Sequence, residues 1–271
     1  MTTQDNPFSL ELSRRKLLAA AGIAAVAAPI FGTEEAGAAR AERSSSDPVV
    51  TPPVAGLHLQ FGTDGSSEMV VSWHTLQPIR HPRVLLGRLD GRLQQTVEAK
   101  ETSYADAKSH QVVYAYHAKL GGLLADSAYL YGALHDGADA EFGSFRTSPR
   151  GRAPFTFTSF GDQGTPTLGK RYVPPAGVTI PSPLYVNDNR GSPAAGDTTL
   201  GVERLRPLFH LFNGDLSYAN LADDRVRAWW DFWANNSRSA RNRPWMPSAG
   251  NHENELGNGP IGYQARDQHC Q

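Results

Sequence analysis

The fold is decided by the stretch Leu208-Phe209-His210-Leu211-Phe212-Asn213-Gly214-Asp215-Leu216-Ser217-Tyr218. Its apolar run, residues 208–212, predicts a buried strand, and the following Asn-Gly pair is a turn signal that ends the strand. Asp215 therefore lies just beyond the carboxyl end of this strand. In open α/β sheets ligands bind beyond the carboxyl ends of strands, so this carboxylate is well placed to bind a metal or a substrate.

The same pattern occurs twice more along the chain. Upstream, a β-favouring run ends at residue 160 and leads through a glycine to Asp162. Downstream, a second run leads through Gly250 to Asn251 and His252. If the three strands are parallel neighbours, their carboxyl ends meet at one rim of the sheet. The sequence therefore predicts a metal site at that rim.

The three blocks, in this order, resemble the metallophosphoesterases, and the tyrosine three residues after the second aspartate makes the chain similar to a purple acid phosphatase. The family pattern runs D-x-G, G-D-x-x-Y, G-N-H-[DE], V-x-x-H and G-H-x-H. Its first three parts stand here as Asp162-Gln163-Gly164, Gly214-Asp215-Leu216-Ser217-Tyr218 and Gly250-Asn251-His252-Glu253. Three ordered blocks are far more specific than one. The last two parts are absent, so the resemblance implies a C-terminally truncated member.

The resemblance also implies a centre of two metal ions, which lower the pKa of a bound water and clamp the phosphoryl group. The implied metal ligands are Asp162, Asp215, Tyr218 and Asn251. Asp215 is expected to bridge the ions, and the phenolate of Tyr218 favours Fe(III), with Fe(II), Zn or Mn as the second ion. His252 is expected to contact the substrate phosphate and help protonate the leaving group, with Glu253 as its orienting partner.

The implied function is that of an exported acid phosphatase that hydrolyses small phosphate monoesters. An alternative stays open, because the missing histidine motifs leave too few ligands for two metals. The chain would then be an inactive truncated product that acts at most as an exported binding or structural protein.

Residues 1–38 predict a twin-arginine signal peptide. Arg14-Arg15 precede an alanine-rich apolar stretch, and Ala36-Gly37-Ala38 is a candidate cleavage site. The apolar stretch, about 15 residues long, is shorter than the roughly 20 residues that span a bilayer, which argues against a stable membrane anchor. We expect export by the twin-arginine machinery into the cell envelope or the medium, with residues 39–54 as a flexible linker.

The composition is that of a globular protein, with 39% hydrophobic and 20% charged residues. Basic residues number 26 and acidic residues 27, so the sequence shows no electrostatic footprint for nucleic acid. The single cysteine, Cys270, allows no disulfide within the chain.

Short β-rich runs separated by turn signals predict an all-β sandwich, similar to a fibronectin type III module, over residues 55–148. The expected strands cover residues 57–61, 69–75, 84–89, 112–120, 129–134 and 142–147. Trp73 is expected in the core. Leu123 and Leu124, followed by Tyr129-Leu130-Tyr131, resemble the tyrosine corner of such modules. A carbohydrate- or wall-binding module and a packing partner for the enzyme domain both fit, and the lack of an exposed aromatic row favours the packing partner. The six histidines of this part are expected at the surface or on strand faces.

Residues 149–271 are expected to form the N-terminal part of an α/β metallophosphoesterase sandwich. The stretch between Asp162 and Asp215 is rich in proline and glycine and predicts a long surface loop near the cleft. Residues 225–237 carry three tryptophans at helical spacing and predict an amphipathic helix. These rings would suit a stacking platform for a sugar or base, but core packing is favoured because they share one helix face.

Overall fold

The computed structural model describes residues 10–11, 51–89, 92–165, 170–171, 176–179, 185–186, 194–222 and 224–253. The predicted signal peptide and linker lie almost wholly outside these ranges. Within them, β1 (Leu10–Glu11) pairs antiparallel with β5 (Arg92–Glu98). The described part of the chain holds no helix that is both long and apolar enough to cross a membrane.

Two antiparallel sheets form the first part of the chain, with strand orders β2-β3-β7-β6 and β1-β5-β4-β8-β9. The remaining strands are β2 (Ala55–Phe61), β3 (Met69–Thr75), β4 (Arg83–Arg88), β6 (Lys100–Ala105), β7 (Val112–Leu120), β8 (Ala128–Leu134) and β9 (Glu141–Arg146). Every strand expected from the sequence in this part is present. Two further strands, β5 and β6, are not predicted from the sequence because their side chains are mostly polar.

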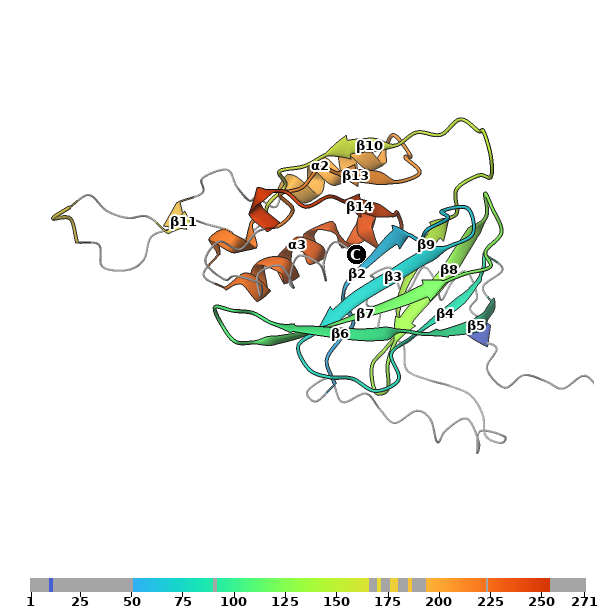
Figure 1. Ribbon diagram of the computed structural model, residues 1–271, viewed down its shortest axis with the longest axis horizontal. Coiled ribbons are helices and arrows are strands. Elements are labelled where there is room, and N and C mark those ends of the chain that lie inside the picture. Colours follow the sequence, from blue (N-terminus) through green and yellow to red (C-terminus); the bar gives the residue numbers. More distant parts are fainter. Residues whose placement is uncertain are drawn as a thin grey trace, which may run out of the picture.

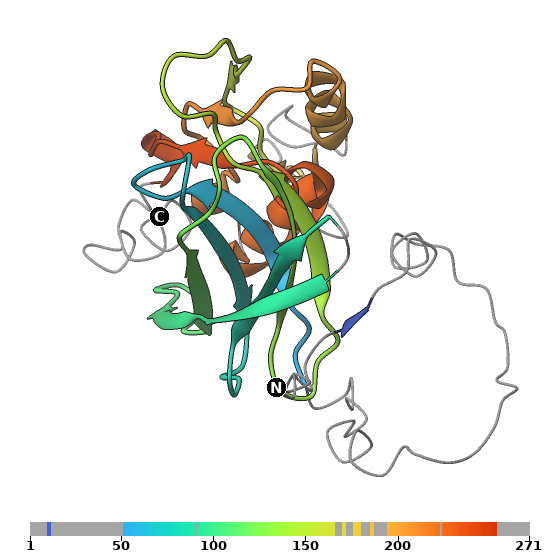
Figure 2. The ribbon, with the colours of Figure 1, turned by 90° about the vertical axis from the view of Figure 1, so that its right-hand side faces the viewer.

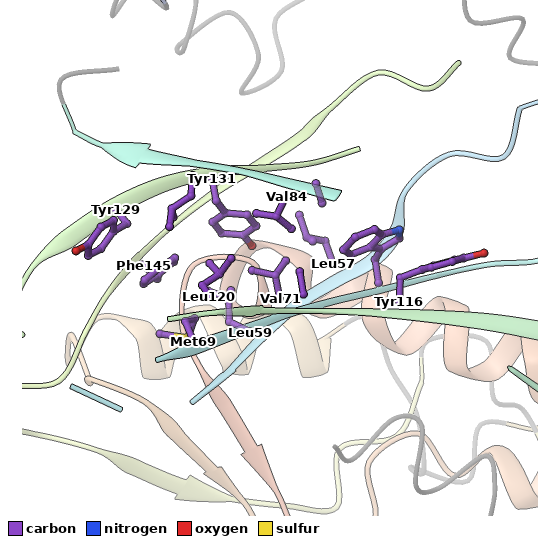
Figure 3. Close-up of a cluster of buried hydrophobic side chains, with 14 of the residues drawn as sticks. Leu57, Leu59, Met69, Val71, Val84, Tyr116, Leu120, Tyr129, Tyr131 and Phe145 are labelled. Carbon is purple, nitrogen blue, oxygen red and sulfur yellow. The ribbon is translucent and has the colours of Figure 1, made fainter. Parts of the chain in front are cut away.

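The core of this sandwich lies between the two sheets (Figure 3). Leu59 and Val71 from one sheet face Val84 and Tyr131 from the other, and all four are fully buried. Alternate residues of each strand point into this layer, as expected for a two-sheet sandwich. Trp73, expected in the core, is only 1% exposed.

The predicted tyrosine corner is confirmed. The hydroxyl of Tyr129 accepts a hydrogen bond from the backbone N–H of Leu124 at 2.8 Å. Its ring stacks on Phe145 with a centroid distance of 5.3 Å, so the corner is fixed from both ends. This contact ties the turn before β8 to the sandwich core.

The second part of the chain is a parallel three-stranded sheet with helices on one side. Its strands are β10 (Thr158–Phe160), β13 (His210–Phe212) and β14 (Trp245–Pro247), in the order β10-β13-β14. The helices are α2 (Ala194–Glu203), α3 (Arg225–Ala240) and the short 3-10 helices η1 (Ala219–Leu221) and η2 (Asn251–Glu253). A separate two-stranded ladder pairs β11 (Lys170–Arg171) with β12 (Tyr185–Val186).

The stretch between Asp162 and Asp215 is not the continuous loop that its composition predicts, because α2 lies inside it. The surroundings of Gly196 explain why this helix contains a glycine. A Cβ at this position would lie 2.7 Å from the side-chain oxygen of Asn235 and 2.9 Å from its carbonyl oxygen. The glycine therefore permits close packing of α2 on α3, which propensity alone does not reveal.

A buried polar cluster holds the beginning of β13 against the two helices. His210 is fully buried, and its Nε2 lies 2.8 Å from Glu203 Oε1. Arg243 also pairs with Glu203, at 2.8 Å. Burial alone would raise the pKa of Glu203, but hydrogen bonds from His210, Arg243 and Ser239 outweigh it and lower the pKa to about 2.

Helix α3 lies between the sandwich and the parallel sheet (Figures 1 and 2). Its first turn is capped by Asp224, whose side chain accepts a hydrogen bond from the N–H of Arg227. Trp229 and Trp233 are buried, and the favoured interpretation of the tryptophans as core packing is confirmed for both. Trp233 approaches Trp245 of β14, with ring centroids 6.2 Å apart.

Helix α3 also packs on two histidines of the sandwich. We call this contact the seam: His58 against Trp233, and His74 against Trp230. The ring of His58 stacks on Trp233 with a centroid distance of 4.0 Å and an interplanar angle of 6°. His74 meets Trp230 edge-on at 4.9 Å. The sequence predicts surface or strand-face positions for the histidines of the sandwich. His58 and His74 lie on strand faces, where α3 covers them.

Burial lowers the pKa of both seam histidines. The pKa of His58 falls to about 3 and that of His74 to about 4, with loss of hydration as the largest cause in each case. The Nδ1 atom of His58 lies 2.6 Å from the carbonyl oxygen of Gly56, which opposes the shift only in part. Both imidazoles are therefore neutral around neutral pH.

Further contacts join the sandwich to α3 at each of its ends. Near the beginning of α3, Arg225 pairs with Asp106 at 3.6 Å, and both side chains are buried. Beyond its last residue, the carbonyl of Arg241 accepts a hydrogen bond of 2.8 Å from the hydroxyl of Tyr131. These contacts support the interpretation of the sandwich as a packing partner for the second part of the chain.

Candidate metal centre

The three motif blocks lie side by side at one rim of the parallel sheet. β10 pairs with β13, and β13 pairs with β14, all in parallel, so the predicted neighbour relation of the three strands is confirmed. We call residues 161–165, 213–218 and 248–253 the rim loops. The first two run alongside each other, with Gln163 N–H donating to the carbonyl of Asp215 at 3.2 Å and Gly164 N–H to that of Leu216 at 2.8 Å.

Three of the predicted ligands have a left-handed backbone, which is uncommon for residues other than glycine. Their φ angles are 55° for Asp162, 54° for Asp215 and 56° for Tyr218. Such conformations cost of order 1 kcal/mol or more each, and they concentrate where a side chain must point in a fixed direction. The rim loops therefore carry strain at the positions chosen from the sequence.

The first rim loop meets the second through a side-chain hydrogen bond. The hydroxyl of Tyr218 donates to Asp162 Oδ1 at 2.7 Å. The two residues are 56 positions apart in the sequence, so only the parallel pairing of β10 and β13 brings them together. A phenol and a carboxylate at hydrogen-bond distance are both suited to binding one hard cation.

Asp215 contacts the third rim loop. Its Oδ1 accepts a hydrogen bond of 2.9 Å from the backbone N–H of His252. The loops approach so closely here that a Cβ on Gly250 would lie 2.3 Å from Asp215 Oδ1. Asn251 follows this glycine at the beginning of η2 and has an exposed side chain. The structure thus places all four predicted ligands on one rim.

The predicted role of Glu253 as the partner of His252 is wrong. His252 Nδ1 lies instead 3.0 Å from the side-chain oxygen of Asn220, in η1. Because that oxygen can only accept, Nδ1 carries the proton and Nε2 is the second nitrogen available for chemistry. The ring of His252 also packs on Tyr218 at 4.3 Å. Asn220 lies outside the three motif blocks, which is why the sequence did not single it out.

Gln163, inside the first motif, anchors its loop to both helices. Its Nε2 donates to Thr199 Oγ1 of α2 at 2.8 Å and to Asn236 Oδ1 of α3 at 2.7 Å. Asp162 therefore follows a strand and precedes a side chain that is fixed to the helical layer. No local pattern in the sequence indicates this role of the glutamine.

Gly214→Ala is expected to destabilise the chain and displace the third rim loop. Gly214 has φ +83°, and a Cβ there would lie 2.6 Å from the backbone of Gly250. Strain at positive φ costs of order 1 kcal/mol, and the backbone clash adds to it. Thermal unfolding of this variant is compared with that of Gly151→Ala, which has φ +76° and nothing within 4 Å of the new Cβ. If the two variants lose the same amount of stability, the close approach of the loops does not contribute to stability.

Comparison with known proteins identifies the relatives of this fold. Residues 54–150 match the family described as purple acid phosphatase, N-terminal domain. A probable purple acid phosphatase of Arabidopsis thaliana is 27% identical over 192 residues, which cover 70% of this chain and 37% of that protein. The chain is related to the purple acid phosphatases.

Two further comparisons bear on this purple acid phosphatase relationship. An uncharacterized protein of Mycobacterium tuberculosis is 56% identical over 214 residues, covering 79% of this chain and 39% of that protein. The structure of a purple acid phosphatase from yellow lupin seeds matches with a TM-score of 0.58 and 21% identity, over 79% of this chain and 40% of that one. The chain thus spans about two fifths of the length of these relatives.

The comparisons confirm the predicted fold class, an all-β sandwich followed by part of an α/β metallophosphoesterase sandwich. They place the chain, at family level, among phosphoesterase-type hydrolases. The likeness to the lupin structure shows the fold alone.

The side chains of the rim fit part of a metal centre of the purple acid phosphatase kind. The two carboxylates, the phenol and the amide are hard oxygen donors, which suit Fe(III) and other hard cations. In the described ranges, no three His, Cys, Asp or Glu side chains cluster closely enough to hold a metal.

Proposed function

We propose that this protein is a metal-dependent acid phosphatase that hydrolyses small phosphate monoesters, and that the rim loops hold part of its two-metal centre. The observation that carries the proposal is the 2.7 Å hydrogen bond between Tyr218 and Asp162, on the rim that also presents Asp215 and Asn251. The family relationship supports the same chemistry. Two metals need more ligands than these four, so the proposal includes further ligands from outside the described residues.

Each side chain of the rim has a distinct task in this proposal. Asp162, Tyr218, Asp215 and Asn251 would hold Fe(III) together with Fe(II), Zn or Mn. When bound, the ions supply a water of lowered pKa and neutralise charge on the phosphoryl oxygens. Asn220 fixes the ring of His252 through Nδ1. The Nε2 atom of His252 is then free to hold the proton that the leaving oxygen needs.

Export is a further part of the proposal. It is supported by Arg14-Arg15 before an alanine-rich apolar stretch, which is typical of a twin-arginine signal. We propose that the protein acts outside the cytoplasm, in the cell envelope or the medium. The cell fraction in which the protein accumulates decides this point.

Titration with ferric iron tests the metal site directly. We expect a visible absorption band from a phenolate bound to Fe(III), and we expect Tyr218→Phe to abolish it. Tyr129→Phe is the matched control, because that hydroxyl bonds Leu124 in the sandwich. Asp215→Asn is expected to weaken ferric binding about a hundredfold, since loss of a group that merely supports a ligand already costs roughly 10–100-fold.

The control for the aspartate is Asp126→Asn, which also has a positive φ, 50°, but pairs with Arg146 away from the rim. A chain that binds no iron, or a band that survives in Tyr218→Phe, would contradict the proposed site. Hydrolysis of an aryl phosphate with added iron and zinc then measures turnover. Activity that persists in Asp215→Asn would contradict the proposed function.

A further inference from the structure

Glu253 is a buried carboxylate without a task in the proposed chemistry. It closes η2 and is only 2% exposed. Among the described residues, none of the ion pairs involves it. An ionised carboxylate that is buried needs strong hydrogen bonds to offset the loss of its hydration. The partners of Glu253 therefore show what it does.

Three backbone N–H groups donate to this carboxylate. Glu253 Oε2 accepts from Asp215 at 2.8 Å and from Gly250 at 2.7 Å. Its Oε1 accepts from Leu216 at 2.7 Å. These short distances are typical of charge-assisted hydrogen bonds, which are about twice as strong as those between neutral groups.

The donors come from two different rim loops. Asp215 and Leu216 follow β13, whereas Gly250 follows β14 and directly precedes the predicted ligand Asn251. The contact is also reciprocal, because Asp215 Oδ1 accepts a hydrogen bond from the N–H of His252 at 2.9 Å. The carboxylate of each loop thus satisfies backbone donors of the other.

We propose that Glu253 is a positioning residue that fixes the spacing of Asp215 and Asn251 for a bound cation. This inference rests on the proposed function and deepens it, because it assigns a determinant of metal affinity that is not itself a ligand. Groups that orient metal ligands commonly change affinity about 10–100-fold when they are lost. The N–H groups of Asp215 and Gly250 share one oxygen, so their separation depends directly on this side chain.

Glu253→Gln tests the inference with little change in shape. The amide has one oxygen, whereas the three N–H groups use both oxygens of the carboxylate. In either orientation of the amide, at least one N–H group therefore loses its acceptor. Ferric iron titrated into the full chain is expected to bind about 10–100-fold more weakly than to the unmodified protein. Amide hydrogen exchange at Asp215, Leu216 and Gly250 is expected to accelerate about tenfold or more.

Two matched variants keep the test decisive. Glu253→Asp retains the charge on a shorter side chain and is expected to restore part of the affinity and of the protection from exchange. Glu141→Gln removes a carboxylate that pairs with Arg241 at 3.1 Å, far from the rim loops in the sequence, and is expected to leave iron binding unchanged. If Glu253→Gln fails to fold, Glu253→Asp is compared with Glu141→Gln. Weaker iron binding in Glu253→Asp than in Glu141→Gln then supports the inference, and equal binding overturns it.

The outcomes separate this inference from the proposed function. Iron binding in Glu253→Gln within about twofold of the unmodified protein would overturn the inference, as would an equal loss in Glu141→Gln. If the unmodified chain binds no iron, the proposed function fails. Amide exchange then still decides the link between the loops, because unchanged protection in Glu253→Gln would overturn it.

Discussion

Acidification from about pH 7 to about pH 5 is expected to lower the free energy of unfolding by about 4 kcal/mol through the two seam histidines. His58 and His74 have pKa values of about 3 and about 4 in the folded chain, against 6.5 for an ordinary histidine. The folded state thus binds fewer protons than the unfolded state. The contribution of each seam histidine to the free energy of unfolding is fully present above about pH 6.5. As the pH is lowered from there towards the pKa in the folded chain, this contribution decreases by about 1.4 kcal/mol per pH unit.

Denaturant unfolding followed by tryptophan fluorescence at several pH values measures this effect. His58→Gln and His74→Gln are each expected to remove about half of the seam's contribution to the pH dependence, apart from any loss of stability at neutral pH. His81→Gln is the matched control, because His81 pairs with Asp136 and its side chain is 73% exposed. A free energy of unfolding that stays constant between about pH 7 and about pH 5 would refute the assignment of neutral seam histidines.

This pH dependence constrains the proposed acid phosphatase. The rim loops follow β13 and β14, and α3 packs on the same strands through Phe232 and Trp233. Protonation of a seam histidine weakens the packing of α3 on the sandwich. Because α3 also packs on β13 and β14, protonation weakens the support of the rim loops as well. We therefore expect the low-pH limit of function to be set by the seam as well as by the chemistry of the site.

The sequence predicted those parts of the fold in which local pattern and tertiary role agree. Residues 112–120 form a β-rich run, and β7 has these bounds. Tyr129-Leu130-Tyr131 resembles a tyrosine corner, and Tyr129 makes the corresponding contact. The three motif blocks each combine a β-favouring run with a glycine and a ligand-type residue. Parallel pairing was enough to bring them to one rim.

The remaining features depend on contacts that no local pattern encodes. β6 has only one buried residue, Tyr104, and pairs along the polar edge of its sheet. α2 contains two glycines in a stretch whose composition predicts a loop, but Gly196 permits its close packing on α3. Glu253 was assigned to His252 because the two are neighbours in the sequence. In the fold, its carboxylate is directed to the backbone of Asp215, a residue 38 positions away.

The histidines show the same limit. His58 and His74 have no ligand spacing, and the sequence left surface and strand-face positions open. Their burial follows from α3, which lies more than 150 residues further along the chain. The helix itself was expected, but its second packing face was not. An amphipathic pattern predicts one buried face, whereas α3 contacts a sheet on each side.

Trp233→Ala is expected to lower the free energy of unfolding by about 3 to 5 kcal/mol, the range for loss of a large buried aromatic side chain. Trp233 is 1% exposed and lies between His58 of the sandwich and Trp245 of the parallel sheet, with ring distances of 4.0 Å and 6.2 Å. Its removal leaves a cavity where α3 joins the sandwich to the parallel sheet.

The matched control for this variant is Trp230→Ala, because Trp230 is half-buried and meets His74 only edge-on. We expect it to cost about 1 to 2 kcal/mol, since less apolar surface leaves water there. Because the sandwich has its own core, Trp233→Ala is also expected to separate unfolding into two transitions, with the second part of the chain melting first. A single transition with a loss no larger than that of Trp230→Ala would show that Trp233 does not couple the two parts. In that case other contacts, such as those of Arg225 with Asp106 and of Tyr131 with Arg241, would couple the two parts.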